Sequence, residues 1–193
     1  MPPIVLASTS PYRRELLQRL RLPFSVQAPR VDERVLPGES PGATACRLAL
    51  AKAQAVARDL PGAIVIGSDQ VADVDGEALS KPGTHEAALA QLTRMQGREV
   101  VFHTALAVVG PGGGQQVDDV RTAVRFRRLP FEQLDAYLRL ERPYDCAGAA
   151  KIESLGIVLL ESVRSDDPTA LIGLPLISLT AMLAACGVRL PAP

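Results

Sequence analysis

Tryptophan is absent from this chain of 193 residues, and aromatic residues of all kinds make up only 4% of it. Histidine is nearly as scarce, since the chain has only His85 and His103. So few imidazoles argue against a Ser-His-Asp triad and against a metal site built from several histidines. If the protein uses a metal, we expect oxygen ligands, which suit magnesium or manganese.

Cysteine is also rare, and Cys46, Cys146 and Cys186 lie far apart along the chain. An odd number of scattered cysteines argues against a disulfide framework and against a zinc knuckle. The apolar run at 4–7 is too short for the core of a signal peptide, and no run approaches the roughly 20 residues of a membrane span. We therefore expect a cytoplasmic protein that has no membrane partner.

Neither sign of charge is in excess, because 21 Lys and Arg residues balance 21 Asp and Glu residues. Proteins that bind polyanions usually carry a basic excess, so long nucleic acid is not an expected partner. A local basic pocket for a small anion remains compatible with this balance. Hydrophobic residues make up 47% of the chain, which is typical of a globular protein.

The hydrophobic pattern predicts strands and helices that mix βα units with a hairpin. Strands are expected at 4–7, 24–28, 63–66 with a continuation to 74, 100–109, 117–126 and 157–161. Helices are expected from 11, from 40 to about 60, from 84 to near 97, at 131–140 and at 174–186. The glycine-rich stretch 110–114 predicts a hairpin loop. This order indicates an α/β fold with a mixed sheet and flanking helices, without internal repeats or a linker that would divide it.

The first candidate site is the polar stretch Ser8-Thr9-Ser10-Pro11-Tyr12-Arg13-Arg14, which joins the first predicted strand to the first helix. Such a turn directs backbone N–H groups and the positive end of the helix dipole at an anion. Arg13 or Arg14 would add a planar fork that matches a phosphate. An ordinary helix N-cap with two solvated arginines explains the same residues. The stretch lacks the glycines of a Walker loop, which argues against a P-loop enzyme.

Asp69 is the second candidate, because it follows a strand that is apolar throughout. A carboxylate in that position needs a partner, a metal or a function, since an unpaired buried charge is costly. A structural aspartate that accepts hydrogen bonds from turn amides is the alternative.

Two lysines and a glutamate are further candidates. Lys52 falls on the apolar stripe of its predicted helix, from which a lysine either extends to solvent or points inward at an anion. Lys81, just before Pro82, has no positional pattern of its own. Glu33 in its loop would ordinarily be solvated. It becomes important as a partner of Asp69, because two carboxylates binding one hard cation are common in phosphoryl chemistry.

Several separate motifs, in order and over nearly the whole chain, resemble those of the Maf family of nucleotide pyrophosphatases. The opening motif is Leu6-Ala7-Ser8-Thr9-Ser10-Pro11-Tyr12-Arg13-Arg14-Glu15-Leu16-Leu17. The others are Lys52-Ala53, Gly67-Ser68-Asp69-Gln70-Val71, Lys81-Pro82, Ala147-Gly148, Gly156-Ile157 and Gly173-Leu174-Pro175-Leu176. The resemblance implies a single Maf/ITPase-like domain over 1–193, with a twisted mixed sheet and two lobes around a central cleft.

One branch of that family, the YceF type, is the more similar. Gln70, Cys146-Ala147-Gly148, Glu153 and Asp167-Pro168-x-x-Leu171 resemble this branch, which is associated with hydrolysis of 7-methyl-GTP rather than of dTTP and UTP. Relatives often have an aromatic residue at the position of Ala150, so this wall of the pocket departs from the family pattern.

The resemblance also implies a role for each matching residue. Asp69 matches the proton acceptor. The polar set around the triphosphate and its metal comprises Ser8 and Arg13 as phosphate ligands, with Glu33, Lys52 and Lys81 as catalytic residues. Glu33 and Asp69 would hold the divalent cation, Mg²⁺ or Mn²⁺. The positions linked to substrate specificity are Tyr12, Gln70 and Glu153.

The expected reaction converts 7-methyl-GTP to 7-methyl-GMP and diphosphate, which prevents incorporation of modified nucleotides. The partner is therefore a small nucleoside triphosphate, and a homodimer is expected only from the general frequency of twofold assembly. One alternative is a nucleotide-binding regulator of septum formation and cell division. Another is a housecleaning pyrophosphatase for deaminated purine, other non-standard or pyrimidine triphosphates. Glu153 disfavours xanthine, whose O2 acceptor replaces the guanine amine.

Overall fold

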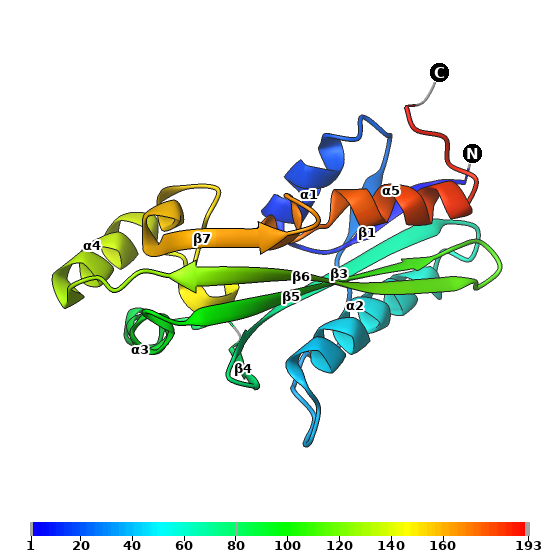
Figure 1. Ribbon diagram of the computed structural model, residues 1–193. Helices are drawn as coiled ribbons and strands as arrows, with labels where there is room; N and C mark the ends of the chain where they lie inside the picture. Colours follow the sequence, from blue (N-terminus) through cyan, green and yellow to red (C-terminus); the bar gives the residue numbers. More distant parts are fainter. Residues whose placement is uncertain (1, 80, 192–193) are drawn as a thin grey trace.

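The computed structural model describes residues 2–79 and 81–191 (Figure 1). The strands within these ranges are β1 (Ile4–Ala7), β2 (Ser25–Gln27), β3 (Ile64–Val74), β4 (Glu77–Leu79), β5 (Glu99–Val109), β6 (Gln115–Phe126) and β7 (Leu160–Ser165). The helices are α1 (Pro11–Gln18), α2 (Pro41–Ala57), α3 (His85–Met95), α4 (Phe131–Glu141) and α5 (Leu176–Ala185). Short 3-10 helices follow as η1 (Ala147–Ala149), η2 (Leu155–Leu159) and η3 (Ala170–Ile172).

The strands form one mixed sheet in the order β2-β1-β3-β5-β6-β7, with β4 paired to β3. β1 runs parallel to β2 and to β3, whereas the β3–β5, β5–β6 and β6–β7 pairs are antiparallel. The mixed sheet and the hairpin through 110–114 were both predicted, and both predictions are confirmed. Pairing in the hairpin extends from Glu99 opposite Arg125 to Val109 opposite Gln115.

The strand predicted at 157–161 is wrong over most of its length, because residues 155–159 form η2 and β7 begins at Leu160. A tight turn precedes η2, where the Gly156 N–H donates to the Lys151 carbonyl at 2.9 Å. A Cβ at Gly156 would lie 2.4 Å from that oxygen, so the turn requires glycine. A short apolar run cannot by itself distinguish a strand from a helical turn.

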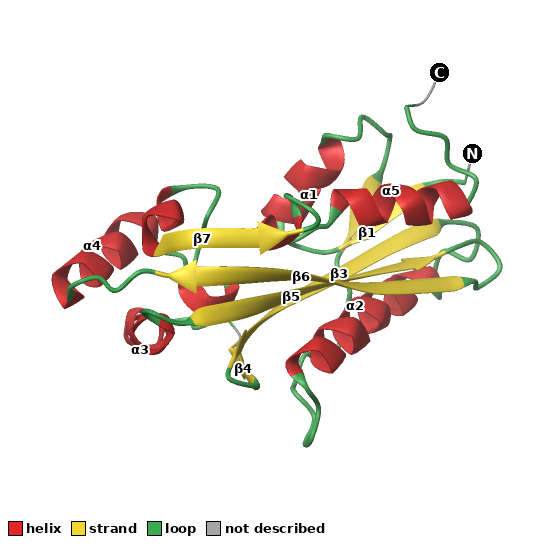
Figure 2. Cartoon of the chain, viewed as in Figure 1, coloured by secondary structure: helices red, strands yellow, loops and turns green. Residues whose placement is uncertain are grey.

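Helices cover both faces of the sheet, with α2 on one face and α1 and α5 on the other (Figure 2). Successive side chains of β1 point to opposite faces of the sheet and so contribute to the two helix layers in turn. Ile4 and Leu6 pack in the cluster that includes α1 and α5, whereas Val5 and Ala7 pack against α2. The core on both sides of this strand is therefore apolar, as is usual for a parallel strand that is covered on both faces.

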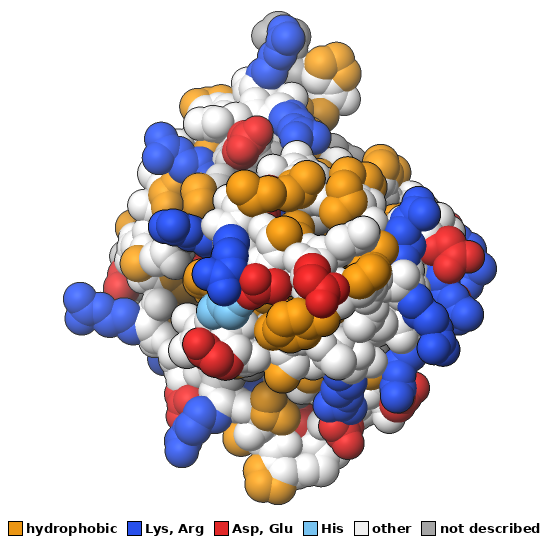
Figure 3. Space-filling model, turned by 90° about the vertical axis from the view of Figure 1, so that its left-hand side faces the viewer, with side chains coloured by type: hydrophobic (Ala, Val, Ile, Leu, Met, Phe, Trp, Pro, Cys, Tyr) orange, Lys and Arg blue, Asp and Glu red, His pale blue; other side chains and the backbone are white. Residues whose placement is uncertain are grey.

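A third cluster fills the end of the molecule opposite the two termini, where α3 and α4 pack on the far ends of β3, β5 and β6. This end faces the viewer in Figure 3. Side chains of both charge signs alternate there with apolar ones, in keeping with the equal numbers of basic and acidic residues. Among the described residues, no helix is both long and apolar enough to cross a membrane.

The sheet has an opening in its pairing between these two ends. β1 stops pairing with β3 at Ala7, opposite Gly67, and β4 takes up the same edge of β3 only from Ala72. The intervening segment of β3, residues 68–71, borders a cavity on that edge. Alternate side chains of this segment point to opposite faces of the sheet, so the cavity receives groups from both.

Candidate active site

The cavity at the open edge of β3 has a volume of about 290 Å³. Segments from seven parts of the chain line it: Ser8–Arg13, Pro29 with Glu33, Lys52, Asp69 with Gln70, Lys81, Asp145–Ala147 with Ala150 and Glu153, and Leu171–Gly173. Every site residue proposed from the sequence is among them. The structure thus brings together the proposed site residues, of which the first and the last, Ser8 and Glu153, are 145 positions apart in the sequence.

Lys52 is at the centre of the charged side of the cavity. Its Nζ donates to Asp69 Oδ1 at 2.6 Å and lies 2.9 Å from Glu33 Oε1. The Lys52 side chain is 6% exposed and that of Asp69 11%, whereas Glu33 is half exposed. The lysine therefore points inward rather than extending to solvent, and Asp69 is paired with a cation rather than with turn amides.

Gly67 explains how α2 brings Lys52 so close to β3. A Cβ at Gly67 would lie 2.2 Å from the Ala49 carbonyl oxygen and 2.7 Å from the Ala53 nitrogen. The helix faces the strand with small residues, Ala45, Ala49 and Ala53, all fully buried. The close approach places Lys52, which directly precedes Ala53, beside Asp69, which lies two residues after Gly67 on the same face of β3.

Arg13 reaches the cavity from the first turn of α1. Ser10 caps this helix by accepting from the Arg13 N–H at 3.4 Å, and Pro11 occupies the first helical position, as predicted. The Arg13 Nε donates to the Gly173 carbonyl at 2.9 Å. Burial lowers the pKa of Arg13, and the carboxylates of Asp69 and Glu33 oppose that shift. Arg14 lies elsewhere, in a shallow pocket with Gln18 and Phe24.

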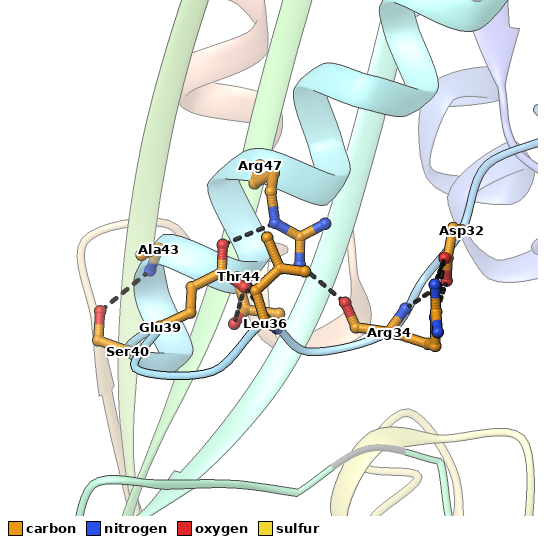
Figure 4. A network of polar contacts seen from close by, with 8 residues as sticks. All are labelled: Asp32, Arg34, Leu36, Glu39, Ser40, Ala43, Thr44 and Arg47. Carbon is orange, nitrogen blue, oxygen red and sulfur yellow. Dashed lines mark hydrogen bonds and ion pairs between the residues drawn. The ribbon is translucent and has the colours of Figure 1, made fainter.

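Glu33 reaches Lys52 from a loop that is fastened to α2 by Arg47 (Figure 4). Arg47 donates to both carboxylate oxygens of Glu39, at 2.6 and 2.7 Å, and to the Arg34 carbonyl at 2.9 Å. Arg34 directly follows Glu33, so this anchor fixes the backbone beside the carboxylate. Burial alone would raise the pKa of Glu33, but the Lys52 ammonium, with Lys81 and Arg13, holds it below the usual value.

The opposite face of β3 contacts the segment before α5. Ser68 Oγ donates to the Gly173 carbonyl at 3.0 Å, and Gln70 Nε2 donates to the Leu171 carbonyl at 3.0 Å. Asp167 organises this segment, because its Oδ2 accepts from the Ile177 N–H at 2.7 Å in the first turn of α5. In the sequence, Asp167 was noted only as part of a motif that resembles the YceF-type branch.

The far side of the cavity is formed by Tyr12 and the segment after α4. The ammonium of Lys151 lies 5.7 Å from the centroid of the Tyr12 ring. Burial, together with Cys146 and Asp145, raises the pKa of Tyr12 to about 12. Burial also raises the pKa of the Cys146 thiol to about 12. Tyr12 and Cys146 are therefore neutral groups at pH 7, whereas Asp145 and Glu153 supply carboxyl groups to this wall.

Comparison with known proteins gives the same assignment as the motifs. A family model described as Maf-like protein matches residues 3–186. This chain belongs to the Maf family. A protein of Burkholderia thailandensis named 7-methyl-GTP pyrophosphatase is 61% identical, over 98% of this chain and 90% of its own. Proteins of the same name from Ralstonia nicotianae and Cupriavidus metallidurans are 62% and 59% identical, over 94% and 96% of this chain and 94% of each relative.

Among solved structures, a nucleoside-triphosphatase, dITP/XTP pyrophosphatase of Mycobacterium abscessus, aligns with a TM-score of 0.47 at 19% identity, over 98% of this chain and all of that one.

The Maf motifs explain most of the cavity but leave some of its lining unassigned. Asp145 stands just before the motif residue Cys146 and had no pattern of its own in the sequence. The Gly173 carbonyl, which accepts from both Arg13 and Ser68, belongs to a motif whose role was not readable. A backbone oxygen has no residue type, so neither composition nor spacing could have indicated this contact.

The carboxylates of Glu33 and Asp69 fit a hard divalent cation that also takes phosphate oxygens. They converge on one point, since both contact the Nζ of Lys52. In the described part of the chain, no group of three or more acidic, histidine or cysteine side chains is placed to hold a metal alone. Magnesium usually takes one or two carboxylates and completes its shell with water and substrate phosphates.

Proposed function

We propose that this Maf protein hydrolyses a nucleoside triphosphate to the monophosphate and diphosphate, with 7-methyl-GTP as the preferred substrate. The observation on which this rests most is Lys52, held between Glu33 and Asp69 in a cavity that has cationic groups at one side and Tyr12 at the other. The activity named for relatives at about 60% identity supports the same reaction and the same substrate.

The cationic side suits the triphosphate. Lys52, Arg13 and Lys81 line it together with the hydroxyl of Ser8, which is 3% exposed. Arginine matches phosphate oxygens in a fork, and lysine acts as a point charge. Positive groups fixed in place before the reaction stabilise negative charge as it develops on the phosphates, and they do so more strongly where water is excluded.

A divalent cation bound by Glu33 and Asp69 would supply charge neutralisation and orientation of the phosphate oxygens. Lys52 contacts both carboxylates and so holds them at one place in the cavity. Lys52 is buried on α2, and its ammonium would bind phosphate oxygens at the same place.

Asp69 is our candidate for the proton acceptor. Water attacks the α-phosphorus, the bond from that phosphorus to the bridging oxygen of the β-phosphate breaks, and diphosphate leaves with the bond's electron pair. The proton of the attacking water passes to the Asp69 carboxylate. Lys52 donates to Oδ1 of that carboxylate and so fixes its orientation.

The other side of the cavity suits a methylated guanine. Guanine offers N1–H and N2–H₂ donors along one edge, and the carboxylate of Glu153 can accept both. Methylation at N7 gives the base a positive charge, which strengthens stacking on the ring of Tyr12. Desolvation raises the pKa of Glu153, so recognition that needs its ionised form weakens as the pH falls.

Release of diphosphate from 7-methyl-GTP with Mg²⁺ or Mn²⁺ tests the proposal. We expect Asp69→Asn to lower kcat by at least about a hundredfold, the range for loss of a general base. Asp73→Asn is the matched control, because Asp73 lies on the same strand and pairs instead with the Gly76 N–H and with His103. Full activity of Asp69→Asn, or a wild type that releases no diphosphate from any nucleoside triphosphate, would refute the assignment.

A further inference from the structure

Glu141 is a carboxylate outside the cavity lining whose side chain is only 10% exposed. It is the last residue of α4 and has three hydrogen-bond partners. Its Oε1 accepts from Lys151 Nζ at 2.8 Å, and its Oε2 accepts from Ser154 Oγ at 2.7 Å and from the Leu155 N–H at 3.0 Å. All three partners belong to one short segment, residues 151–155, so the carboxylate lies inside the curve of a loop.

Tyr137 holds the beginning of the same loop from one turn earlier on α4. Its side chain is buried, its hydroxyl donates to the Ala149 carbonyl at 3.0 Å, and it accepts from the Lys151 N–H at 3.1 Å. Positions four apart on a helix lie on one face, so Tyr137 and Glu141 form a single platform. The Gly156 N–H closes the loop on the Lys151 carbonyl at 2.9 Å.

The tip of this closed loop is Glu153, which lines the cavity and is the residue we assign to the guanine edge. Glu153 stands between Lys151 and Ser154, two of the three groups that Glu141 holds. Lys151 in turn lies over the ring of Tyr12. Through these contacts Glu141 fixes the loop that contains Glu153 and the ammonium of Lys151 at the Tyr12 ring. Glu141 itself does not line the cavity.

We propose that Glu141 is a positioning residue for base selectivity, acting through Glu153 and Lys151. This inference rests on the proposed function, because it assigns the recognition of the base to the wall that Glu141 supports. Glu141→Gln replaces one carboxylate oxygen by an NH₂ group and removes the negative charge. Lys151 then loses the carboxylate with which it pairs, and the loop loses a contact at one of its ends. The phosphate side, which is built on β3 and α2, keeps its geometry.

The test is the ratio of kcat/KM for 7-methyl-GTP to kcat/KM for UTP, measured by diphosphate release. We expect Glu141→Gln to lower this ratio about tenfold, the effect of one hydrogen bond to a charged group, with kcat/KM for UTP nearly unchanged. Asp135→Asn is the matched control, since Asp135 lies on the same helix and pairs with His85 and Arg139 instead. This control should keep the wild-type ratio.

A double variant distinguishes positioning from general loosening of the fold. If Glu141 acts through Glu153, Glu141→Gln should change the ratio far less in a Glu153→Gln background than in the wild type. An equal change in both backgrounds overturns the inference. Ser154→Ala provides a second route if Glu141→Gln does not fold, because it removes one of the three contacts. It should lower the ratio in the same direction, and an unchanged ratio overturns the inference.

The wild-type enzyme separates the two hypotheses. Equal hydrolysis of 7-methyl-GTP and UTP would overturn the role of Glu141 and the proposed preference for 7-methyl-GTP, and it would leave the pyrophosphatase activity itself standing. A wild type that hydrolyses neither nucleotide would overturn the proposed function, and the selectivity role would fall with it.

Discussion

The two sides of the cavity are built in different ways. On the phosphate side, Ser8, Lys52 and Asp69 are buried, and they belong to the end of β1, to α2 and to β3. On the base side, Asp145 and Glu153 are exposed and belong to segments between helices. Lys52 and Asp69 are thus fixed by the core, whereas Glu153 depends on a loop held by polar contacts from α4.

The largest expected effect is a contrast between two lysines, one on each side. Lys52→Met should lower kcat/KM by at least about a hundredfold for every nucleotide, because a fixed donor to developing phosphate charge is lost. Lys151→Met should instead affect mainly 7-methyl-GTP, by about tenfold, since it removes one of the three contacts through which Glu141 holds the loop of Glu153. Steady-state kinetics with 7-methyl-GTP, GTP and UTP make the comparison. If Lys52→Met changed the selectivity between bases, the assignment of phosphate binding and base recognition to separate sides of the cavity would be wrong.

A smaller effect is expected where the phosphate side also depends on a loop. Arg47→Met removes the contacts to Glu39 and to the Arg34 carbonyl, so Glu33 loses its fixed backbone. We expect kcat/KM to fall about tenfold, equally for all nucleotides, as for other supports of a metal ligand.

Arg34→Ala is the control for this prediction. It keeps the carbonyl that Arg47 contacts and removes only an exposed pair with Asp32, whose contribution is small. If both variants lost activity equally, the position of Glu33 would depend on the Arg34 side chain rather than on the hydrogen bond from Arg47 to the Arg34 carbonyl.

The smallest effect concerns stability and its dependence on pH. Hydrogen bonds from Arg47, assisted by Thr44 and the Leu36 N–H, lower the pKa of Glu39 from 4.5 to about 2. A depressed folded pKa stabilises the protein above pH 4.5, and this contribution disappears as the pH falls from 4.5 toward 2. Urea unfolding should therefore find Glu39→Gln less stable than the wild type at pH 7, with a difference that shrinks in acid. A difference that stays constant over this range would mean that the Glu39 charge does not anchor the loop.

The sequence was sufficient for the elements whose pattern is long and regular. The apolar strand at 63–66, the hairpin of β5 and β6 and the start of α1 follow from local patterns, so they were readable without tertiary contacts. The motifs also indicated every proposed site residue from Ser8 to Glu153. They did not decide whether Lys52 points inward, because that depends on how closely α2 approaches Gly67, and an isolated helix pattern contains no such distance.

The part that could not be predicted depends on contacts between distant segments. Glu141 directly follows the helix predicted at 131–140 and belongs to no motif, and only the packing of α4 against residues 149–156 buries it. The run at 157–159 has the composition of a strand, and the turn at Gly156 makes it η2 instead. Local propensity is a weak guide wherever a neighbouring segment determines the backbone path.

The open edge of β3 has a consequence for how such a protein can change during evolution. Asp69 and Gln70 are adjacent in sequence, yet one points to Lys52 on the α2 face and the other to the Leu171 carbonyl on the opposite face. Substitutions at position 70 can therefore alter what the cavity accepts without moving the residue proposed to take the proton. Because β1 ends early, both faces of β3 reach the cavity at this point. Proton transfer and substrate selection are then assigned to opposite faces of one strand, so a lineage can exchange substrates while keeping its reaction.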